Sequence, residues 1–442
     1  MTTTTVQTET AAGVTHRNAS RSADDRTGQT KVCFYGVFGV QNLGNECTLQ
    51  AILHNLRERL PNADVHAVCY RPEDTILRHN IPAVAICSES RTGGPGTQRS
   101  GRLRRLMRIL FQRIPGEIAH WWRAVQGLRG TSLVIMTGTG MITDYITTPF
   151  GYPYDIFMWT LVSRLAGSRV RFVGVGVGPI YNPLSRMFIR GALSLADLRS
   201  YRDEFSRIRI AKAGFDSSKD YVFPDLAFSL PEELFSRCSV RTRSKLTVGL
   251  GIMDHRDVHL HPTAEEQEAA YIAYREKMCD FISWLVNHGY GIRILQGDSR
   301  YDVITRADVR KRLEERGIRY DDAGIVDEDT KTVEELLAQL AQVDLIVSPR
   351  FHNLLLGLMF EVPGVSISYD PKNDALQEGI GLGQYRQSLL ELDVHKLIEQ
   401  FTDLEARRTE IKPMIRRRAA EYRELLNQEY DLVFGDLYAA RS

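Results

Sequence analysis

The sequence predicts an α/β protein with two domains of similar size, each built around a parallel sheet. Three observations support this prediction. Short apolar runs rich in β-branched residues alternate with segments of helical periodicity, and several of these runs end in glycines. The alternation stops at a polar, basic stretch near residues 231–245 and then starts again. The chain has 442 residues, which is enough for two large domains.

Composition excludes several classes of protein. Hydrophobic residues make up 43% and charged residues 25% of the chain, as in a globular protein rather than a disordered or fibrous one. The 56 basic residues balance the 55 acidic ones, so the charge does not indicate a dedicated nucleic-acid-binding protein. Six cysteines without CxxC or zinc-ligand spacing predict reduced thiols, and no apolar run is long enough to span a membrane. We expect a cytoplasmic protein.

Residues 31–235 are predicted to form the first domain, after a polar leader over residues 1–30 that we expect to be disordered. Its predicted strands are KVCFYGVFG, DVHAVCYR, SLVIMTGTG and RVRFVGVGVGP. The last two are so apolar that they read as central strands, covered on both faces. Between the first and second strands, leucines and isoleucines recur at helical spacing up to Pro61. The segment LADLRSYRDEFSRIRIAKAGF is interpreted as helix and loop, and YVFPDLAF as a short strand.

Residues 245–393 are predicted to form the second domain, with the strands KLTVGLGIM, GIRILQGD, VDLIVSPR and GVSISYD. Helical segments separate these strands. One begins at about Thr263 and ends at about Asn287, with Gly289 just after it. Residues 394–442 form a charged tail that is also expected to be helical.

A basic insertion over residues 97–130 interrupts the first domain. From residue 97 to 129 it contains eight arginines and a single carboxylate, Glu117, and it includes Trp121 and Trp122. Its apolar face could pack on its own domain, or residues 99–129 could lie on anionic lipid headgroups, where arginine and tryptophan both belong. It carries no nucleic-acid-binding motif.

Glycines follow three of the predicted strands. The first turn contains Gly36, Gly39, Asn42 and Gly44 and leads into a helix, where backbone N–H groups can bind an anion. It matches neither the Walker sequence nor GxGxxG, so it could instead be only a tight turn. Further glycines end the two central strands, where ligands bind in open α/β sheets; they are Gly138, Gly140, Gly174, Gly176 and Gly178.

The strongest candidates for chemistry are Arg350 and His352, between an apolar strand and an apolar helix. A guanidinium can grip a carboxylate or phosphate, and a histidine can transfer a proton near neutral pH. The alternative is an arginine paired to a structural carboxylate beside a capping histidine. If the sheet is parallel, Tyr369, Asp370 and Lys372 end the next strand and face the same cleft.

Other polar residues are interpreted more plainly. Taken alone, Arg202 and Asp203 read as a surface arginine and a helix cap. The histidines of DHRDVHLH, residues 254–261, lack a regular spacing, so we expect a loop and no metal site. Cys47 is expected to be a small buried packing residue.

Four blocks of the sequence, in this order, resemble the polysaccharide pyruvyl transferase family. They are the glycine turn ending NLGNE, the strand ending in glycines before Asp144, VGVGVGP followed by RDEFS and FPDLAF, and SPRFHNLLLGLMFEVPGVSISYDPK at residues 348–372. They span about residues 32–382. The last block is the most specific. The leader, the basic insertion and the distal tail lie outside the resemblance.

The resemblance implies two Rossmann-like domains arranged as in GT-B glycosyltransferases, with the site in the cleft between them. It implies transfer of the pyruvyl group of phosphoenolpyruvate, as a ketal, to a cell-wall or exopolysaccharide sugar that is often lipid-linked, with no further cofactor. The family's Arg-x-His falls on Arg350 and His352, and its Arg-Asp on Arg202 and Asp203. His352 is the candidate proton donor. The expected phosphoenolpyruvate ligands are Arg350, Arg202, Gly44, Asn42, Gly138 and Gly140, and the expected acceptor ligands are Asn45, Glu46, Asp144, Tyr369 and Lys372.

The chain departs from the family pattern at two places. Asn45 stands where the family usually has an aspartate, and Thr137 and Thr139 replace two glycines of the central strand end. No carboxylate can be named from the sequence as the general base. Two other interpretations therefore remain open, a glycosyltransferase with a nucleotide-sugar donor and a non-catalytic carbohydrate-binding protein.

Overall fold

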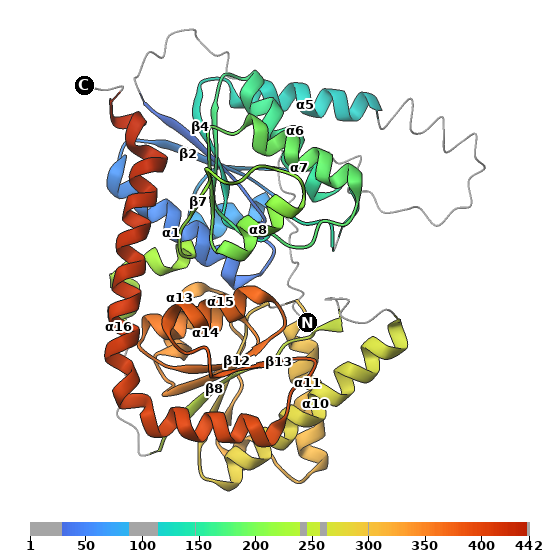
Figure 1. The fold of residues 1–442 in the computed structure, drawn as a ribbon, viewed down its shortest axis with the longest axis vertical. Coiled ribbons are helices and arrows are strands. Elements are labelled where there is room, and N and C mark those ends of the chain that lie inside the picture. The colour runs from blue at the N-terminus through green and yellow to red at the C-terminus, as the bar shows by residue number, and fades with distance from the viewer. Residues whose placement is uncertain are drawn as a thin grey trace, which may run out of the picture.

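The computed structural model describes residues 29–87, 114–145, 147–238, 245–256, 263–298 and 300–439. They form two parallel sheets, each covered by helices, in an α/β fold of two domains (Figure 1). Most of the predicted leader, the insertion up to residue 113 and the last residues of the histidine-rich loop lie outside the described residues.

The first sheet has the strand order β3-β2-β1-β4-β5-β6-β7, and all its pairs are parallel. Its strands are β1 Lys31–Tyr35, β2 Asp64–Cys69, β3 Ala83–Ala85, β4 Thr131–Thr137, β5 Arg169–Val175, β6 Leu198–Tyr201 and β7 Tyr221–Val222. Its helices are α1 Leu43–Arg59, α2 Pro72–His79, α5 Ile114–Leu128, α6 Tyr152–Leu165, α7 Pro183–Leu195, α8 Glu204–Lys212, the short 3-10 helix η2 Leu226–Ser229 and α9 Glu232–Ser236. As predicted from their apolar sequences, β4 and β5 are central and almost wholly buried.

The second sheet has the order β10-β9-β8-β11-β12-β13, again with parallel pairs. Its strands are β8 Thr247–Gly251, β9 Gly291–Leu295, β10 Ile325–Val326, β11 Leu345–Ser348, β12 Gly364–Ser368 and β13 Arg386–Ser388. Its helices are α10 Ala264–Asn287, α11 Asp302–Glu315, α12 Tyr320–Ala323, α13 Val333–Leu340, α14 Phe351–Met359 and α15 Pro371–Ile380. Thr263 caps α10 by accepting a hydrogen bond from the backbone of Glu266 at 3.1 Å, which confirms the predicted start of that helix.

One predicted element is wrong. Strand β6 lies inside the segment that the sequence analysis interpreted as helix and loop. It has only four residues, too few to show a period of two, and its backbone pairs with both β5 and β7. Pairing between strands therefore decides its conformation, and a periodicity read from one segment cannot detect that pairing.

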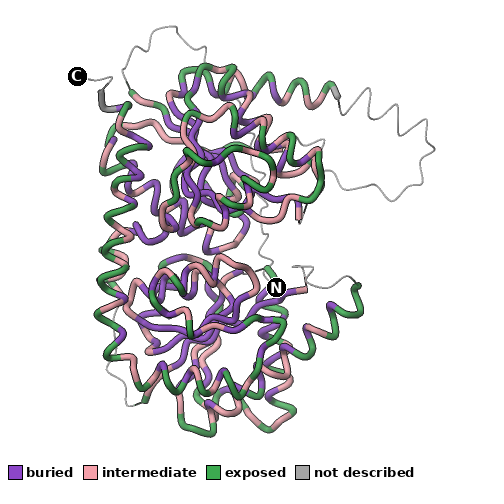
Figure 2. The backbone as a smooth tube through the Cα atoms, viewed as in Figure 1, coloured by how far each residue is buried: buried purple, intermediate pink, exposed green. Residues whose placement is uncertain are grey.

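Alternate residues of the central strands face two separate apolar cores. One face of the first sheet packs against α1, η2 and the last helix of the chain, and the other packs against α5, α6 and α7. The first of these cores is continuous with the core of the second domain. Buried residues accordingly run through both sheets (Figure 2).

The last helix, α16 Val394–Ala439, connects the two domains. It runs below the second sheet, bends, and then lies along both domains up to the first sheet (Figure 1). Pro413 lies inside this helix and cannot donate to the carbonyl of Thr409, which accounts for a bend. Beyond the bend, Leu426, Tyr430 and Phe434 are buried in the core beneath the first sheet.

The described part of the basic insertion is helix α5. Trp121 is buried there, with its ring 5.5 Å from that of Trp159, whereas Trp122 is 63% exposed. This part of the insertion therefore packs on its own domain, and contact with lipid stays a prediction. Among the described helices, none is both long and apolar enough to cross a membrane. All six cysteines lie in the described residues and are free thiols.

Candidate active site between the two domains

The glycine turn after β1 meets the second domain at the start of α1. Asn42 caps this helix by accepting a hydrogen bond from the backbone of Asn45 at 3.3 Å. Its side-chain amide donates to Asp298 at 3.3 Å, and the backbone N–H of Leu43 donates to the carbonyl of Gly297 at 3.1 Å. Asn42 and the first N–H of α1 thus hold the loop after β9 of the second domain. The turn that was predicted to bind an anion is, in this structure, a contact between the domains.

His352 lies against the next residue of that helix, Gly44. A Cβ atom on Gly44 would lie 2.1 Å from Nδ1 of His352, closer than any real contact. His352 comes from the first turn of α14, at the carboxyl end of β11. Because only glycine leaves room for the imidazole, this position fixes His352 between the domains.

Asp225 lies between His352 and Arg202. Its Oδ2 is 3.4 Å from Nη1 of Arg202, and its Oδ1 is 3.8 Å from Nε2 of His352. The guanidinium of Arg202 also lies 5.3 Å from the centre of the Phe351 ring. Asp225 is the N-cap residue of η2. Its carboxylate is held in place by a hydrogen bond that it accepts from the backbone of Ala227 at 3.0 Å. A carboxylate of the first domain therefore joins an arginine of that domain to the histidine of the second.

One of the predicted glycines, Gly176, makes room for Arg202. A Cβ atom on Gly176 would lie 2.6 Å from the guanidinium, whereas one on Gly140 would lie 3.9 Å from it, an ordinary contact. The guanidinium therefore lies over the ends of β4 and β5. Gly138 has a different role, since a Cβ atom there would lie 2.6 Å from the carbonyl oxygen of Gly174 on the neighbouring strand.

Some buried polar atoms of the residues described above have no hydrogen-bond partner among the described residues. Among them are Nε of Arg202 and Nε2 of His352, and the hydroxyl of Thr139 beside the end of β4 is another. Buried polar groups are nearly always paired, so unpaired ones call for an explanation. A ligand between the domains would provide one, because N–H and O–H groups can bind a carboxylate or phosphate.

The surroundings of His352 keep its imidazole neutral in the free protein. Burial, together with the positive charges of Arg202 and Lys372, lowers the pKa of His352 to about 4 against the opposing effect of Asp225. Burial opposes the charge of Arg202 as well, but Asp225 and Asp203 outweigh it and raise the pKa of that guanidinium. Asp370 of the second domain also faces Arg202 of the first. The positive charge of Lys372 helps to keep the pKa of the Asp370 carboxyl low despite its burial.

The predicted role of Arg350 is not supported by its contacts. Its Nε donates to Oδ2 of Asp302 at 3.2 Å, and its Nη2 is bonded to Oδ1. Asp302 is fully buried and also accepts from the backbone of Gly297 and Asp298. The fork of Arg350 thus holds the loop that contacts Asn42. Of the two interpretations of Arg350, the pairing to a structural carboxylate is the one observed, and its gripping of a donor stays a prediction.

Two of the predicted acceptor ligands have structural contacts. Glu46 is 1% exposed, with one oxygen accepting from the backbone of Gly39 at 3.0 Å and the other 2.9 Å from Nε2 of His79. Asp144 accepts from the backbone of Tyr181 and Asn182, at 2.8 Å each. Both carboxylates therefore hold loops, and acceptor binding by Glu46 and Asp144 stays a prediction.

The remaining predicted residues have mixed outcomes. Asn45 donates to the carbonyl of Val37 at 2.9 Å, and Thr137 donates to that of Tyr35 at 2.9 Å, so both stabilise the turn and sheet. Asp203 caps α8 as expected, whereas Arg202 is buried and not on the surface. Burial raises the pKa of the Cys47 thiol, which agrees with a packing role.

A polar groove of about 410 Å³ begins at Tyr369 and Asp370 and extends to Arg386, Ser388 and Lys396. The ammonium of Lys372 lies 4.9 Å from the centre of the Tyr369 ring. One of its lining residues, Asp370, is also among the charges that act on Arg202. Acceptor binding by Tyr369 and Lys372 stays a prediction, and this groove is where it would occur.

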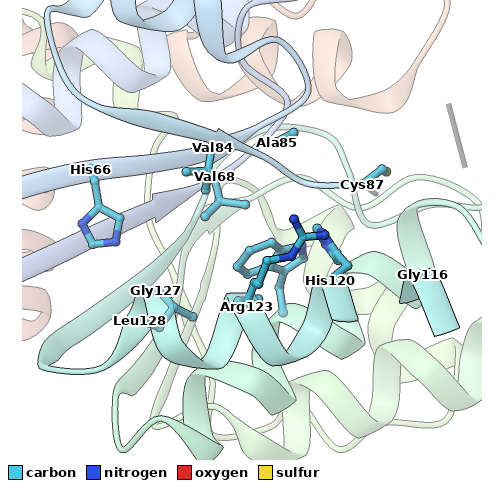
Figure 3. A pocket seen from close by; sticks show the side chains of 12 residues that line it. His66, Val68, Val84, Ala85, Cys87, Gly116, His120, Arg123, Gly127 and Leu128 are labelled. Atoms are coloured by element: carbon cyan, nitrogen blue, oxygen red, sulfur yellow. The ribbon is translucent and has the colours of Figure 1, made fainter. Parts of the chain in front are cut away.

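Another cavity, of about 470 Å³, lies elsewhere in the first domain. It is enclosed by β2, β3 and α5, with His66, Cys87 and Arg123 among its lining residues (Figure 3). Its walls are mostly apolar, and none of the residues around Asp225 lines it. In the described part of the chain, no group of three or more His, Cys, Asp or Glu residues is arranged to hold a metal ion.

Asp225 is the functional candidate that the sequence analysis missed. It lies in the quoted block FPDLAF, directly after β7, but no spacing links it to Arg202 or His352. The available signal was an aspartate at a strand end within a family-like block. Its pairing with His352 depends on the docking of two domains.

Replacing Gly44 by alanine tests the position of His352. The added methyl group must displace the imidazole, and a misplacement of about 1 Å can cost about 100-fold in rate. We expect kcat to fall by about that factor while the fold is retained. Gly435→Ala is the matched control, because a Cβ atom there meets nothing within 4 Å and should leave kcat unchanged. Equal kcat for both variants would contradict the placement of His352.

Comparison with known proteins gives both a family and a fold. The family model described as polysaccharide pyruvyl transferase matches residues 42–371, which is well over half of the chain. A search of curated protein sequences gave no match.

Solved structures share the two-domain fold at low sequence identity. HepE from Anabaena in complex with UDP is 12% identical, with a TM-score of 0.55 over 93% of this chain and all of that one, 100%. UDP-GlcNAc 2-epimerase from Methanocaldococcus jannaschii is 11% identical, with a TM-score of 0.53 over 85% of this chain and 92% of that one. The same enzyme from Neisseria meningitidis, bound to UDP-GlcNAc, is 10% identical, with a TM-score of 0.53 over 91% and 99%. These likenesses confirm the predicted GT-B-like fold.

Proposed function

Because the chain belongs to the polysaccharide pyruvyl transferase family, we propose that it transfers the pyruvyl group of phosphoenolpyruvate to a sugar of a cell-surface polysaccharide or its lipid-linked precursor. Phosphate is released, and no further cofactor is needed. The observation that carries this proposal is Asp225 between Arg202 and His352, together with the buried nitrogens of these two side chains, Nε and Nε2, which lack a hydrogen-bond partner among the described residues. The reaction takes place in the cytoplasm, where phosphoenolpyruvate is made.

Binding of phosphoenolpyruvate requires donors for a carboxylate and a phosphate. Nε of Arg202 and the hydroxyl of Thr139 supply such donors at the ends of β4 and β5. Gly176 lets the guanidinium of Arg202 lie directly over the backbone that follows β5, at the strand ends where the anion would bind. These groups are fixed before the ligand arrives, so they can stabilise the charge of the departing phosphate.

The reaction needs one proton donor and one proton acceptor. A proton added to the methylene carbon of phosphoenolpyruvate makes C2 electrophilic, and a sugar hydroxyl then forms a C–O bond to C2. A second hydroxyl of the same sugar forms the other C–O bond as the bond from C2 to the phosphate oxygen breaks. We assign the proton added to carbon to His352, and the removal of the first hydroxyl proton to Asp225, the carboxylate 3.8 Å from it, which returns that proton to His352. The second hydroxyl proton leaves with the phosphate.

Donor binding should also charge His352. In the free protein burial is the main cause that lowers its pKa to about 4, and the positive charges of Arg202 and Lys372 contribute. A bound anion offsets both charges and raises the pKa, so the imidazole takes up a proton near neutral pH. Calorimetry in buffers of different ionisation enthalpy should therefore show proton uptake on binding of phosphoenolpyruvate. The His352→Gln variant should show less uptake, and equal uptake by both proteins would contradict this role.

The proposed function is tested by incubating the protein with phosphoenolpyruvate and pools of bacterial cell-wall and capsular saccharides. We expect inorganic phosphate to appear only when a saccharide is present, and mass spectrometry to find the pyruvyl ketal on that saccharide. Parallel incubations contain UDP-sugars, because UDP-bound proteins share the fold. Release of UDP without release of phosphate would contradict the proposal and favour a glycosyltransferase.

A further inference from the structure

The helix α16 places a carboxylic acid, Glu429, beneath the candidate active site. Glu429 is 0% exposed, and it shares a short hydrogen bond with the hydroxyl of Ser200 on β6. One oxygen of Glu429 has no hydrogen-bond partner among the described residues. The family model ends at residue 371, so neither the family match nor the mechanism above assigns a role to this side chain.

Ser200 connects Glu429 to Arg202. The hydroxyl of Ser200 accepts a hydrogen bond from the backbone of Gly174 at 2.8 Å. Gly174 has a φ of +58°, and the pairing of β5 with β6 shifts register between Phe172 and Val175. Ser200 thus stabilises the irregular end of β5 around Gly174, two residues before Gly176. Arg202 leaves β6 two residues after Ser200 and lies on Gly176.

The same helix, α16, also contacts the segment that carries Asp225. The hydroxyl of Tyr430 lies 2.7 Å from that of Ser229, and the guanidinium of Arg423 donates to the carbonyls of Phe228 and Leu230 at 3.4 Å each. Ser229 and Phe228 belong to η2, the short helix that Asp225 caps. Adjacent residues of α16 therefore contact both segments that carry the first domain's candidate groups.

We propose that Glu429 is a positioning residue that acts as a neutral carboxylic acid, holding Arg202 through Ser200 and β5 while leaving the charge of Asp225 undisturbed. This inference rests on the proposed function for its substrate. The groups that face Glu429 are Ser200 of β6, the backbone of Gly174 of β5 and the carboxylate of Asp225; on its own helix Tyr430 follows it, with Arg59 of α1 over the Tyr430 ring.

The charge state of Glu429 follows from these surroundings. Burial, together with the negative charge of Asp225, raises its pKa to about 8 against the opposing effect of the hydrogen bonds from Ser200 and Gly174. The unfolded chain loses this proton near the ordinary pKa of 4.5, whereas the folded chain keeps it to about 8. The stabilisation is therefore complete below the lower value and is lost as the pH rises toward the higher one. An ionised Glu429 would add a second negative charge near Asp225 and oppose an anionic donor.

The test uses two substitutions of similar size, Glu429→Gln and Glu429→Leu. Glutamine stays neutral and can still bond to Ser200, so we expect its turnover to match wild type near neutral pH and to persist above about pH 8, where wild-type turnover falls. Leucine fills the space but removes the short hydrogen bond to Ser200, whose hydroxyl then donates only to the carbonyl of Phe172 at 3.3 Å. We therefore expect folded protein with kcat reduced by about ten-fold. The same substitutions at Glu424, which is exposed on the same helix, should change neither property.

The outcomes separate this inference from the proposed donor. All variants are titrated with phosphoenolpyruvate and with UDP. If wild type binds only UDP, the proposed donor is wrong. The effect of each substitution at Glu429 is then measured on UDP binding instead. Wild-type ligand binding and turnover by Glu429→Leu would overturn the positioning role. Independently of any ligand, the free energy of unfolding of wild type should fall relative to Glu429→Gln as the pH rises from about 5 to about 8. A constant difference between the two proteins would overturn the neutral state of Glu429.

Discussion

Replacing Arg202 by lysine is expected to lower kcat/KM for phosphoenolpyruvate by about 100-fold or more, the effect of losing one fixed donor to a developing negative charge. Lysine keeps the positive charge that Asp203 and Asp225 require, so the buried carboxylates are not left without a cation. It loses the planar fork and the Nε donor that we assign to phosphoenolpyruvate, an atom 3.7 Å from Asp203 that has no hydrogen-bond partner among the described residues. The loss should therefore appear in donor binding and rate, and not in folding.

The control for this variant is Arg207→Lys, five residues further on and paired to Glu204 on the surface of α8. An exposed ion pair of this kind contributes little, so kcat/KM should stay at the wild-type value. Unfolding by denaturant should show similar stability for the two variants. If Arg202→Lys keeps wild-type kcat/KM, Arg202 does not bind the donor.

Replacing His352 by glutamine is the second change with a large expected effect. Loss of a positioned proton donor typically costs about 100-fold to 10,000-fold in rate, and we expect kcat to fall within that range. KM for phosphoenolpyruvate should change much less, because the anion is assigned to Arg202 and Thr139. Steady-state kinetics on wild type and His352→Gln measure the changes in kcat and KM separately. The exposed His288, changed to glutamine, is the matched control.

The His352→Gln variant should also change how stability depends on pH. The folded protein keeps His352 neutral down to about pH 4, whereas the unfolded chain takes up a proton near 6.5. The unfolded state therefore binds more protons between these values, and the free energy of unfolding falls as the pH drops through that range. Glutamine does not titrate, so this part of the acid loss should be absent. An unchanged acid profile would mean that His352 is protonated in the free protein.

The sequence predicted the fold well where elements are long and strongly patterned. The central strands β4 and β5, and the helix from Thr263 to Asn287, were each recognisable from one segment of sequence. Strand β6 was missed because its four residues have no period of their own. The bend and path of α16 were also beyond prediction, since they depend on packing against both domains.

The site was predicted only in part, because the sequence gives residue types but not their partners. His352 and Arg202 are brought together through Asp225. The family-like blocks indicated His352 and Arg202 as site residues, but not Asp225. Arg350 and Glu46 were equally plausible ligands by type, but buried partners far away in the sequence hold them in structural pairs. Each of those two pairs forms within one domain, whereas the pairing of His352 with Asp225 forms between the two domains.

The most direct test of the central claim is a calorimetric titration of wild type and Arg202→Lys with phosphoenolpyruvate, with UDP as the comparison. The account predicts that wild type binds phosphoenolpyruvate and that the lysine variant binds it at least about ten-fold more weakly. It also predicts that UDP does not compete. Tight binding of UDP to both proteins, with no heat from phosphoenolpyruvate, would contradict the account and place the protein among nucleotide-sugar enzymes of the same fold.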